Sequence, residues 1–241
     1  MEGAERIRIG TSGWQYRHWK GVLYPEDAPA RAWFSFYAAR FDTVEINATF
    51  YHLPEESTFH SWAERAPGGF LYALKFSRYG THLKRLLEPA DTIGLFLERA
   101  RRLGPSLGPV LVQIPPRFHA DPGRLDAFLE AGPAGVPWAV EFRDPDWLRQ
   151  EVYAVLARHG AALVLHDHMP HPRRRTAPWT YRRYHGKVPG GCYSRERLAR
   201  EAEDIAGEAR EGMPVYAYFN NDTHGHAVRN ALELRRMVLG C

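Results

Sequence analysis

The segment VYAYFNNDTHGHAVRNA, residues 215–231, contains two kinds of hydrophobic spacing and decides the fold class. From Val215 to Phe219 every second residue is apolar, which is typical of a β-strand. Polar residues follow at 220–223, and apolar residues at helical spacing begin after Gly225. A strand that passes into a helix in this way is the repeating unit of a parallel α/β fold.

The same unit recurs along the whole chain. Eight strands are predicted, at 6–11, 43–47, 70–76, 110–114, 138–142, 162–166, 180–185 and 215–220. Helices are predicted between them at 29–40, 56–66, 90–103, 121–131, 146–159, 194–211 and 223–238. Eight strands in 241 residues match an α/β fold of the (β/α)8 TIM-like barrel class. An open doubly wound sheet is the alternative, but no G-x-G-x-x-G turn follows the first strand.

One connection departs from the regular pattern. Residues 167–179, DHMPHPRRRTAPW, contain three prolines and no helical spacing, so the link between the sixth and seventh strands is predicted to lack a regular helix. No linker or change of composition divides the chain elsewhere, and a single domain over residues 1–241 is expected.

Composition bounds the class of protein. Hydrophobic residues make up 44% and charged residues 25%, and the net charge of +4 permits an anionic partner without requiring one. The two cysteines, Cys192 and Cys241, form neither a disulfide framework nor a zinc-binding spacing. The N-terminus has no signal-peptide pattern, and no apolar run reaches the about 20 residues of a membrane span. A cytoplasmic protein without a membrane partner is expected, while the oligomeric state is left open.

Strand alternation predicts where the functional side chains lie. If the more apolar face of each strand meets the helices, the opposite face points inward and carries polar residues near the C-terminal end of nearly every strand. Active sites of (β/α)8 barrels lie at that end. The residues that would meet there are Glu45, Lys75, Gln113, Glu141, His166, Arg183, His185 and Asn220. The alternative is a structural layer in which Glu45 and Glu141 pair with Lys75 and Arg183.

The loops after the strands add candidate ligand-binding residues. Trp14 and Tyr16, in TSGWQY, either line a ligand pocket or form a lid of aromatic rings packed on one another. Asn47 and Arg143 begin loops of similar character. In the second of these, Asp144 or Asp146 also fits the pattern of a helix N-cap.

Several motifs in a fixed order resemble a known family. GTSGWQYRHWKGVLYP, TVEINATFYHLP, EFRDPDW, YHG and FNNDTHGHAVRNA are similar to motifs of the YecE-like family, domain of unknown function 72. The resemblance extends from about Ile9 to Leu239 and implies a TIM-barrel-like fold. It implies no reaction.

Four kinds of chemistry fit these residues. An anion could bind at the loops after the seventh and eighth strands, at Gly186, Lys187, Gly190, Gly191, Asn220, Asn221 and Gly225, with Arg183 nearby. The bland alternative is that Asn221 or Asp222 caps the last helix. Glu45 and Glu141 could act as a pair of acid–base carboxylates, as in glycosidases.

The other two kinds are a metal centre and a nucleic-acid surface. Glu45, Glu141, His166, Asp167 and His185 are legitimate ligand types, but Lys75 and Arg183 would repel a cation, so no cofactor is expected and a divalent metal is an alternative. The run Arg173–Arg175, near Trp179, Tyr181 and Arg182, mixes charge with aromatic rings as single-strand nucleic-acid surfaces do, but the run of three arginines favours a solvated basic loop.

The sequence thus favours an enzyme that acts on a small anionic ligand, phosphorylated or carbohydrate-like, by acid–base chemistry. Its expected acid–base groups are Glu45, Glu141 and His166. The expected ligand-binding residues are Trp14, Tyr16, Asn47, Lys75, Gln113, Arg143, Arg183, His185, Asn220, Asn221 and Gly225. A nucleic-acid-binding or nucleic-acid-processing barrel and a non-catalytic ligand-binding protein are the alternatives.

Overall fold

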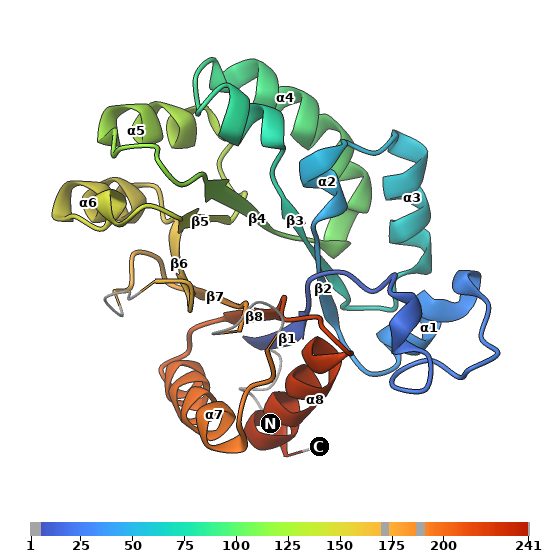
Figure 1. Cartoon of the computed structure of the whole chain (residues 1–241). Helices are drawn as coiled ribbons and strands as arrows, with labels where there is room; N and C mark the ends of the chain where they lie inside the picture. The colour runs from blue at the N-terminus through green and yellow to red at the C-terminus, as the bar shows by residue number, and fades with distance from the viewer. Residues whose placement is uncertain (1–5, 170–173, 187–190, 241) are drawn as a thin grey trace. The chain divides into compact units, whose positions relative to one another are not determined.

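A computed structural model describes residues 6–169, 174–186 and 191–240, in which strands and helices alternate along the chain (Figure 1). The strands are β1 (Ile7–Thr11), β2 (Thr43–Ile46), β3 (Leu71–Lys75), β4 (Leu107–Ile114), β5 (Trp138–Phe142), β6 (Ala162–His166), β7 (Thr180–Tyr184) and β8 (Val215–Phe219). The α-helices are α1 (Trp33–Ala38), α2 (Ala48–Tyr51), α3 (Glu56–Arg65), α4 (Pro89–Ala100), α5 (Pro122–Ala131), α6 (Gln150–Arg158), α7 (Arg195–Arg210) and α8 (His226–Leu239). Short 3-10 segments are η2 (Arg17–Trp19), η3 (Ala30–Ala32), η5 (Arg101–Ser106) and η6 (Pro145–Trp147), and η4 (Tyr79–Leu83) is a π-helical turn.

The element order and the parallel strand pairing give the (β/α)8 fold class that the sequence predicts. All eight predicted strands form. β4 differs most, since it begins at Leu107 and not at 110. Gly108 and Pro109 concealed this extension, because both residues are poor strand formers.

The helical segments differ more from the prediction than the strands do. The helix predicted at 29–40 forms as η3 followed by the shorter α1, and α2 and η4 were not predicted. The described residues of the β6–β7 connection, 167–169 and 174–179, contain no helix, as expected from the prolines.

The described chain separates into two compact units, and each is described by itself. Unit 1 comprises 6–45, 166–168, 179–186 and 191–240, and unit 2 comprises 46–165, 169 and 174–178. The single domain over residues 1–241 therefore stays a prediction.

In unit 1, β8 pairs in parallel with β1 on one side and with β7 on the other, so that Ile9 and Arg183 lie in register with Ala217 and Tyr218. Figure 1 shows the blue strand β1 beside β8, together with the orange and red helices α7 and α8. Apolar residues of both helices are buried, among them Ile205 of α7. This pairing joins the first and last strands of the chain within one core.

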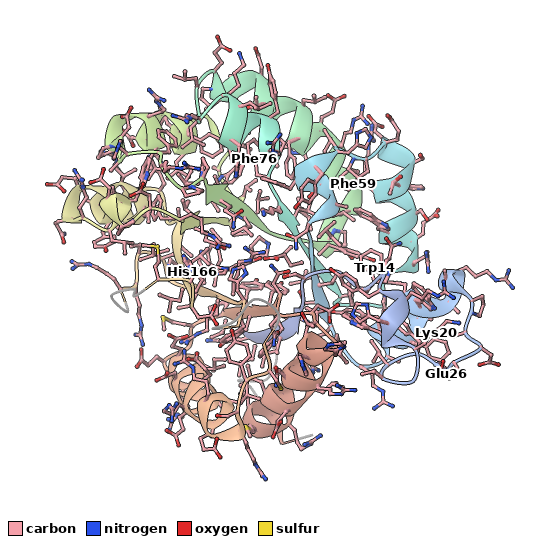
Figure 2. The ribbon with its side chains drawn as sticks, viewed as in Figure 1. Trp14, Lys20, Glu26, Phe59, Phe76 and His166 are labelled. Atoms are coloured by element: carbon pink, nitrogen blue, oxygen red, sulfur yellow. The ribbon has the colours of Figure 1, made fainter. Side chains whose placement is uncertain are left out.

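In unit 2, β3, β4, β5 and β6 pair in parallel in that order. Phe76 follows β3 and packs edge-on against Phe96 of α4 and Phe128 of α5, with ring centroids 5.0 and 5.4 Å away. Phe59 is buried on α3, and Figure 2 labels Phe59 and Phe76. Burial of one such ring contributes about 1.5–3 kcal/mol, so these contacts hold the helices on the strands.

α7 illustrates how one helix of unit 1 is positioned. Ser194 caps it, because the Ser194 hydroxyl oxygen accepts a hydrogen bond from the Arg197 N–H at 3.3 Å. Its inner face includes Leu198 and Ile205, which are fully buried.

Among the described residues, no helix is long and apolar enough to cross a membrane.

Candidate functional site

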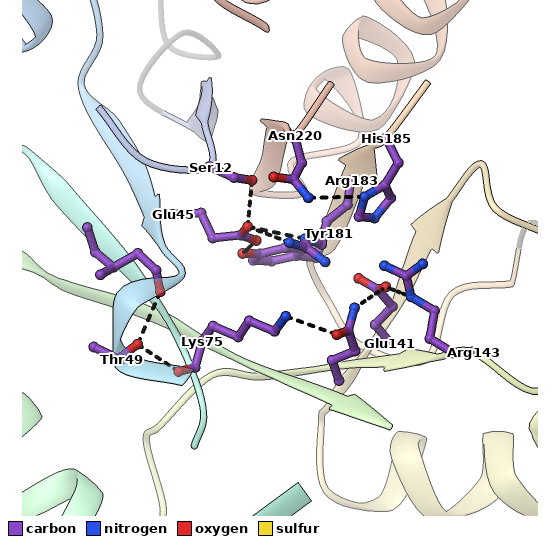
Figure 3. A network of polar contacts seen from close by, with 12 residues as sticks. Ser12, Glu45, Thr49, Lys75, Glu141, Arg143, Tyr181, Arg183, His185 and Asn220 are labelled. Atoms are coloured by element: carbon purple, nitrogen blue, oxygen red, sulfur yellow. Dashed lines mark hydrogen bonds and ion pairs between the residues drawn. The ribbon is translucent and has the colours of Figure 1, made fainter. Parts of the chain in front are cut away.

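In unit 1 the carboxylate of Glu45, near the C-terminal end of β2, is buried and accepts hydrogen bonds on both oxygens (Figure 3). Oε1 accepts from Ser12 Oγ at 2.6 Å and from Arg183 Nη2 at 2.8 Å. Oε2 accepts from the Tyr181 hydroxyl at 2.7 Å. Tyr181 and Arg183 are two residues apart on β7 and therefore face the same side, as strand alternation requires.

The charge of Glu45 follows from these contacts. Burial raises the pKa of this carboxyl, but the Arg183 guanidinium and the hydrogen bonds from Arg183, Ser12 and Tyr181 outweigh it and hold the pKa below its usual value. Glu45 is thus ionised at neutral pH and paired with Arg183, as the structural-layer alternative anticipated for these two residues. A lowered pKa disfavours Glu45 as a proton donor, although it remains a fixed negative charge at the strand ends.

Three histidine rings lie together at the ends of β6 and β7. The rings of His166 and His185 have centroids 6.2 Å apart, and the rings of His168 and His185 are 4.2 Å apart. His166 and His185 are 7% and 5% exposed. The His168 backbone N–H donates to His166 Nδ1 at 3.2 Å, and the Asn220 side-chain amide lies 3.2 Å from His185 Nδ1. The structure thus brings the predicted residues His166, His185 and Asn220 together.

The amides that follow β7 donate to a carboxylate of the protein itself. Asp167 accepts hydrogen bonds from the backbone N–H of His185 at 2.9 Å and of Gly186 at 3.1 Å, and also from the Tyr193 hydroxyl. Burial raises the pKa of Asp167, but the hydrogen bonds from Tyr193 and His185 outweigh it and lower the pKa overall. The part of the predicted anion site that lies after β7 is therefore occupied by Asp167.

At the junction between β8 and α8, the side chain of Asn221 also donates hydrogen bonds to other groups of the protein. Asn221 is fully buried, and its side-chain N–H groups donate to the Gly191 carbonyl and to Asn230 Oδ1, both at 2.9 Å. Gly225, with φ +73°, precedes α8, and neither Asn221 nor Asp222 caps this helix. The alternative that Asn221 or Asp222 caps the last helix is therefore wrong. Lys187 and Gly190 lie outside the described residues.

The aromatic residues of the first loop pack on one another. Trp14 is 5% exposed and meets Phe34 edge-on at 5.3 Å, and the rings of Tyr16 and Trp19 are 4.9 Å apart. Trp19 Nε1 donates to Asp222 Oδ1 at 2.8 Å. Figure 2 labels Trp14. This is the lid-like packing that the sequence offered as one of two interpretations, and it leaves little of Trp14 accessible to a ligand.

In unit 2 a chain of polar contacts connects β3, β4 and β5 (Figure 3). Lys75 Nζ donates to Gln113 Oε1 at 2.9 Å, and Gln113 Nε2 donates to Glu141 Oε1 at 2.7 Å. Arg143 forms an ion pair with the same oxygen of Glu141. Gln113 and Glu141 are register partners on β4 and β5, so they face the same side as strand alternation predicts.

Loop residues of unit 2 have mixed roles. Asn47 precedes α2, and among the described residues its buried Oδ1 has no hydrogen-bond partner. Asp144 caps η6 by accepting from the Asp146 N–H at 3.0 Å, so the N-cap interpretation holds for Asp144. Asp146 instead accepts from the Ala120 N–H at 2.8 Å.

The predicted residues thus fall into two sets. Unit 1 holds Trp14, Tyr16, Glu45, His166, Arg183, His185, Asn220, Asn221 and Gly225, whereas unit 2 holds Asn47, Lys75, Gln113, Glu141 and Arg143. Contacts within each unit are as described above. That both sets share one site stays a prediction.

The suggested nucleic-acid surface stays a prediction, but two of the residues named for it are buried. Tyr181 and Arg182 are 0% and 3% exposed, so neither can contact a nucleic acid. Arg182 turns toward α7, where it pairs with Glu201 at 3.0 Å and with Glu208 at 2.7 Å. Arg174 lies over the Tyr153 ring at 5.2 Å, and Arg173 lies outside the described residues.

Sequence reasoning missed several partners of the site. Ser12 directly follows β1, and Tyr181 shares the face of Arg183, so strand alternation alone would have found both. Tyr193 carried no signal, because its position depends on the course of the β7–α7 connection.

Among the described residues, no group of three or more histidine, cysteine, aspartate or glutamate side chains has an arrangement that could hold a metal ion. The expectation of no cofactor stays a prediction.

The family follows from a comparison with protein-family models. The model described as "Protein of unknown function DUF72" matches residues 8–240. The chain belongs to the DUF72 family. The UPF0759 protein YunF of Bacillus subtilis (strain 168) is a relative that is 23% identical over an alignment of 270 residues, gaps included, and the alignment covers 96% of this chain and 94% of YunF. The family resemblance of the loop motifs is thereby confirmed.

Solved structures support the fold. A DUF72 family protein from Thermotoga maritima MSB8 is 29% identical, with a TM-score of 0.86 over 97% of this chain and 99% of that chain. A glycoside hydrolase family 5 enzyme from Prevotella bryantii B14 is 10% identical, with a TM-score of 0.53 over 99% of this chain and 96% of that chain. The second likeness shows the fold alone and confirms the TIM-barrel class. The family description assigns no reaction.

Proposed function

We propose that this DUF72 protein is an enzyme that acts on a small anionic ligand, phosphorylated or carbohydrate-like, by acid–base chemistry at the strand ends of unit 1. The observation that carries the proposal is the pair of nearly buried histidines, His166 and His185, with ring centroids 6.2 Å apart. A cytoplasmic location is part of the proposal.

The hydrogen bonds of the two rings support proton transfer. His166 Nδ1 accepts from the His168 N–H, so the neutral ring carries its proton on Nε2. When the Asn220 amide donates to His185 Nδ1, it selects the same tautomer in His185. Histidine changes its charge near neutral pH, and a general base or acid works best when its pKa lies near the pH of the reaction.

The charged residues beside the histidines narrow the ligand class. Arg183 is paired with Glu45, and the amides of His185 and Gly186 donate to Asp167. These groups would otherwise bind a phosphate in a barrel of this class. The polar groups of unit 1 therefore favour a hydroxyl-rich, carbohydrate-like part of the ligand over a phosphate group at this place.

The proposal is tested with full-length protein and a panel of sugars and sugar phosphates in D2O, followed by ¹H NMR. This measurement detects hydrolysis, isomerisation, elimination and deuterium incorporation alike. We expect turnover of at least one probe, and His166→Gln should reduce its rate by roughly 10²- to 10⁴-fold, as is typical when a general acid or base is removed.

His18→Gln is the matched control, because His18 is a more exposed histidine of unit 1 that pairs with Asp222 outside the ring cluster. It should leave the rate within about twofold of the parent protein, as surface substitutions usually do. Binding of a probe without turnover by the parent protein would favour the non-catalytic alternative. Equal rates in the parent and in His166→Gln would contradict a catalytic role for His166.

A further inference from the structure

A second group of titratable residues lies in unit 2, where β3 passes into the π-helical turn η4. Lys75 is 7% exposed, and its Nζ lies 4.0 Å from the centroid of the Phe50 ring. The same ring meets His82 edge-on, with centroids 5.0 Å apart. Arg78, four residues before His82, is exposed. Arg78 directly precedes this turn, and its positive charge acts on His82.

We propose that Lys75, Arg78 and His82 form an oxyanion-binding site of unit 2, and that a proton is taken up when the oxyanion binds. The site belongs to unit 2 alone and does not depend on the histidines of unit 1, so it goes beyond the proposed function. It would hold equally for a protein that binds its ligand without turnover, so its test is independent of the test of His166.

The hydrogen bonds of His82 identify the nitrogen that would meet the ligand. The Thr81 hydroxyl donates to the Ser77 carbonyl at 3.0 Å, so it must accept from His82 Nδ1, which lies 2.9 Å away. The neutral ring therefore carries its proton on Nδ1 and has a lone pair on Nε2. An oxyanion can accept a hydrogen bond from Nε2 only after this atom is protonated.

Electrostatics gives the direction of the coupling. Burial and then the positive charges of Lys75 and Arg78 lower the pKa of His82 to about 4, so the ring is neutral at pH 7. The ring contacts the uncharged Phe50 of α2, and Lys75 of β3 is one of the two charges that act on it. The turn η4 also packs against α4 and β4. Gln113 links Lys75 to the Glu141–Arg143 ion pair. A bound oxyanion would offset the two positive charges and raise the pKa of His82.

Linkage turns this coupling into a measurable signature. Because the bound state takes up a proton, the affinity for an oxyanion rises as the pH falls from neutral toward the pKa of His82. A phosphate and a carboxylate share this chemistry. Inorganic phosphate and malonate are therefore compared as separate probes.

The test uses full-length protein with ¹³C-labelled histidine, and follows the His82 ring by NMR between pH 3.5 and 8. Without ligand its titration midpoint should lie near pH 4, and saturating phosphate or malonate should raise this midpoint by about one unit or more, which corresponds to a tenfold or larger coupling. The probe that produces the larger shift shows which class of oxyanion this site of unit 2 prefers.

Two variants and one control complete the experiment. Arg78→Gln should weaken phosphate binding by about ten- to a hundredfold, because a charge-assisted contact is lost. In His82→Gln the affinity should change between pH 7 and pH 5 only as far as the titration of the probe itself requires, whereas the parent should show an additional rise. Arg102→Gln removes an exposed cation of unit 2 at the N-terminal end of β4, and should bind like the parent. An unchanged His82 titration with both probes, or an equal loss in Arg102→Gln, would overturn the proposal.

Discussion

Glu45 is a fully buried carboxylate whose charge is balanced by the buried guanidinium of Arg183. Removal of one partner of such a pair leaves a charge in a place where water cannot solvate it, which is far more costly than the loss of an exposed ion pair. The stability of unit 1 should therefore respond strongly to Glu45→Gln, which replaces one carboxylate oxygen by an amide nitrogen and removes the negative charge.

We expect Glu45→Gln to lower the free energy of unfolding by about 3–5 kcal/mol, because the buried guanidinium of Arg183 loses the negative charge of Glu45. Urea titration followed by circular dichroism measures this loss. Glu55→Gln is the control, since Glu55 is largely exposed where it pairs with Arg99, and a change of under about 1 kcal/mol is expected. A loss in Glu45→Gln no larger than in this control would show that the buried pair is not needed for stability.

The same residue has a defined pH dependence. The pKa of Glu45 is lower in the folded protein than its ordinary value, so the unfolded chain binds the proton more readily. Its contribution to stability is present above the ordinary carboxyl pKa and is lost as the pH falls through the lower, folded value. Glu45→Gln should therefore flatten the acid side of the stability curve.

At the scale of elements, successive residues of β7 point to opposite sides and contact different carboxylates. Its odd-numbered residues Tyr181 and Arg183 contact Glu45, whereas Arg182 points to α7 and its glutamates. The strand holds two neighbouring arginines that are both nearly buried, and each has its own carboxylate partners. Such a strand cannot shift by one residue without exchanging both sets of partners.

Arg182→Leu tests how much the ion pairs between Arg182 and the glutamates of α7 contribute to stability. Glu208 loses its arginine, and Glu201 retains the contact with Arg197 at 2.8 Å, so mainly one buried carboxylate is left unbalanced. We expect a loss of about 3–5 kcal/mol in the free energy of unfolding. The double variant Arg182→Leu/Glu208→Gln should recover part of this loss in urea titrations. A double variant less stable than the single one would contradict the assignment.

At the scale of the whole molecule, acid stability combines several groups. Glu45, Asp167 and His82 all have folded pKa values below their ordinary values, so unfolding takes up protons at each of them. The melting temperature should therefore fall as the pH is lowered from neutral. His82 contributes to this loss of stability mainly between pH 6.5, its ordinary pKa, and about pH 4, its pKa in the folded protein.

His82→Gln should reduce the decrease of melting temperature between pH 6.5 and pH 4, because glutamine has no proton to take up on unfolding. Differential scanning calorimetry at several pH values measures this. His52→Gln, a change at an exposed histidine of the same unit, serves as the control. An identical pH profile in His82→Gln and in the parent protein would show that His82 keeps its ordinary pKa.

The fold class could be predicted because strand and helix periodicities recur from end to end, and because alternation places residues such as Gln113 and Glu141 on one face. The contacts of Asp167 with His185 and Gly186 could not, since they depend on the path of an irregular connection. His82 was overlooked for a related reason. It lies on a π-helical turn that has no simple sequence periodicity, and its importance arises only from Lys75 and Arg78 nearby.

The contact between Asp167 and the amides that follow β7 has a consequence for any anion that approaches them. A carboxylate attached to the chain acts as a competitive inhibitor that never diffuses away, with an effective concentration in the millimolar range or above. An external phosphate must displace it, so its apparent affinity at these amides is reduced by the occupancy of Asp167. Ligand selection at this end of the strands is therefore decided partly by a competitor that the chain carries itself.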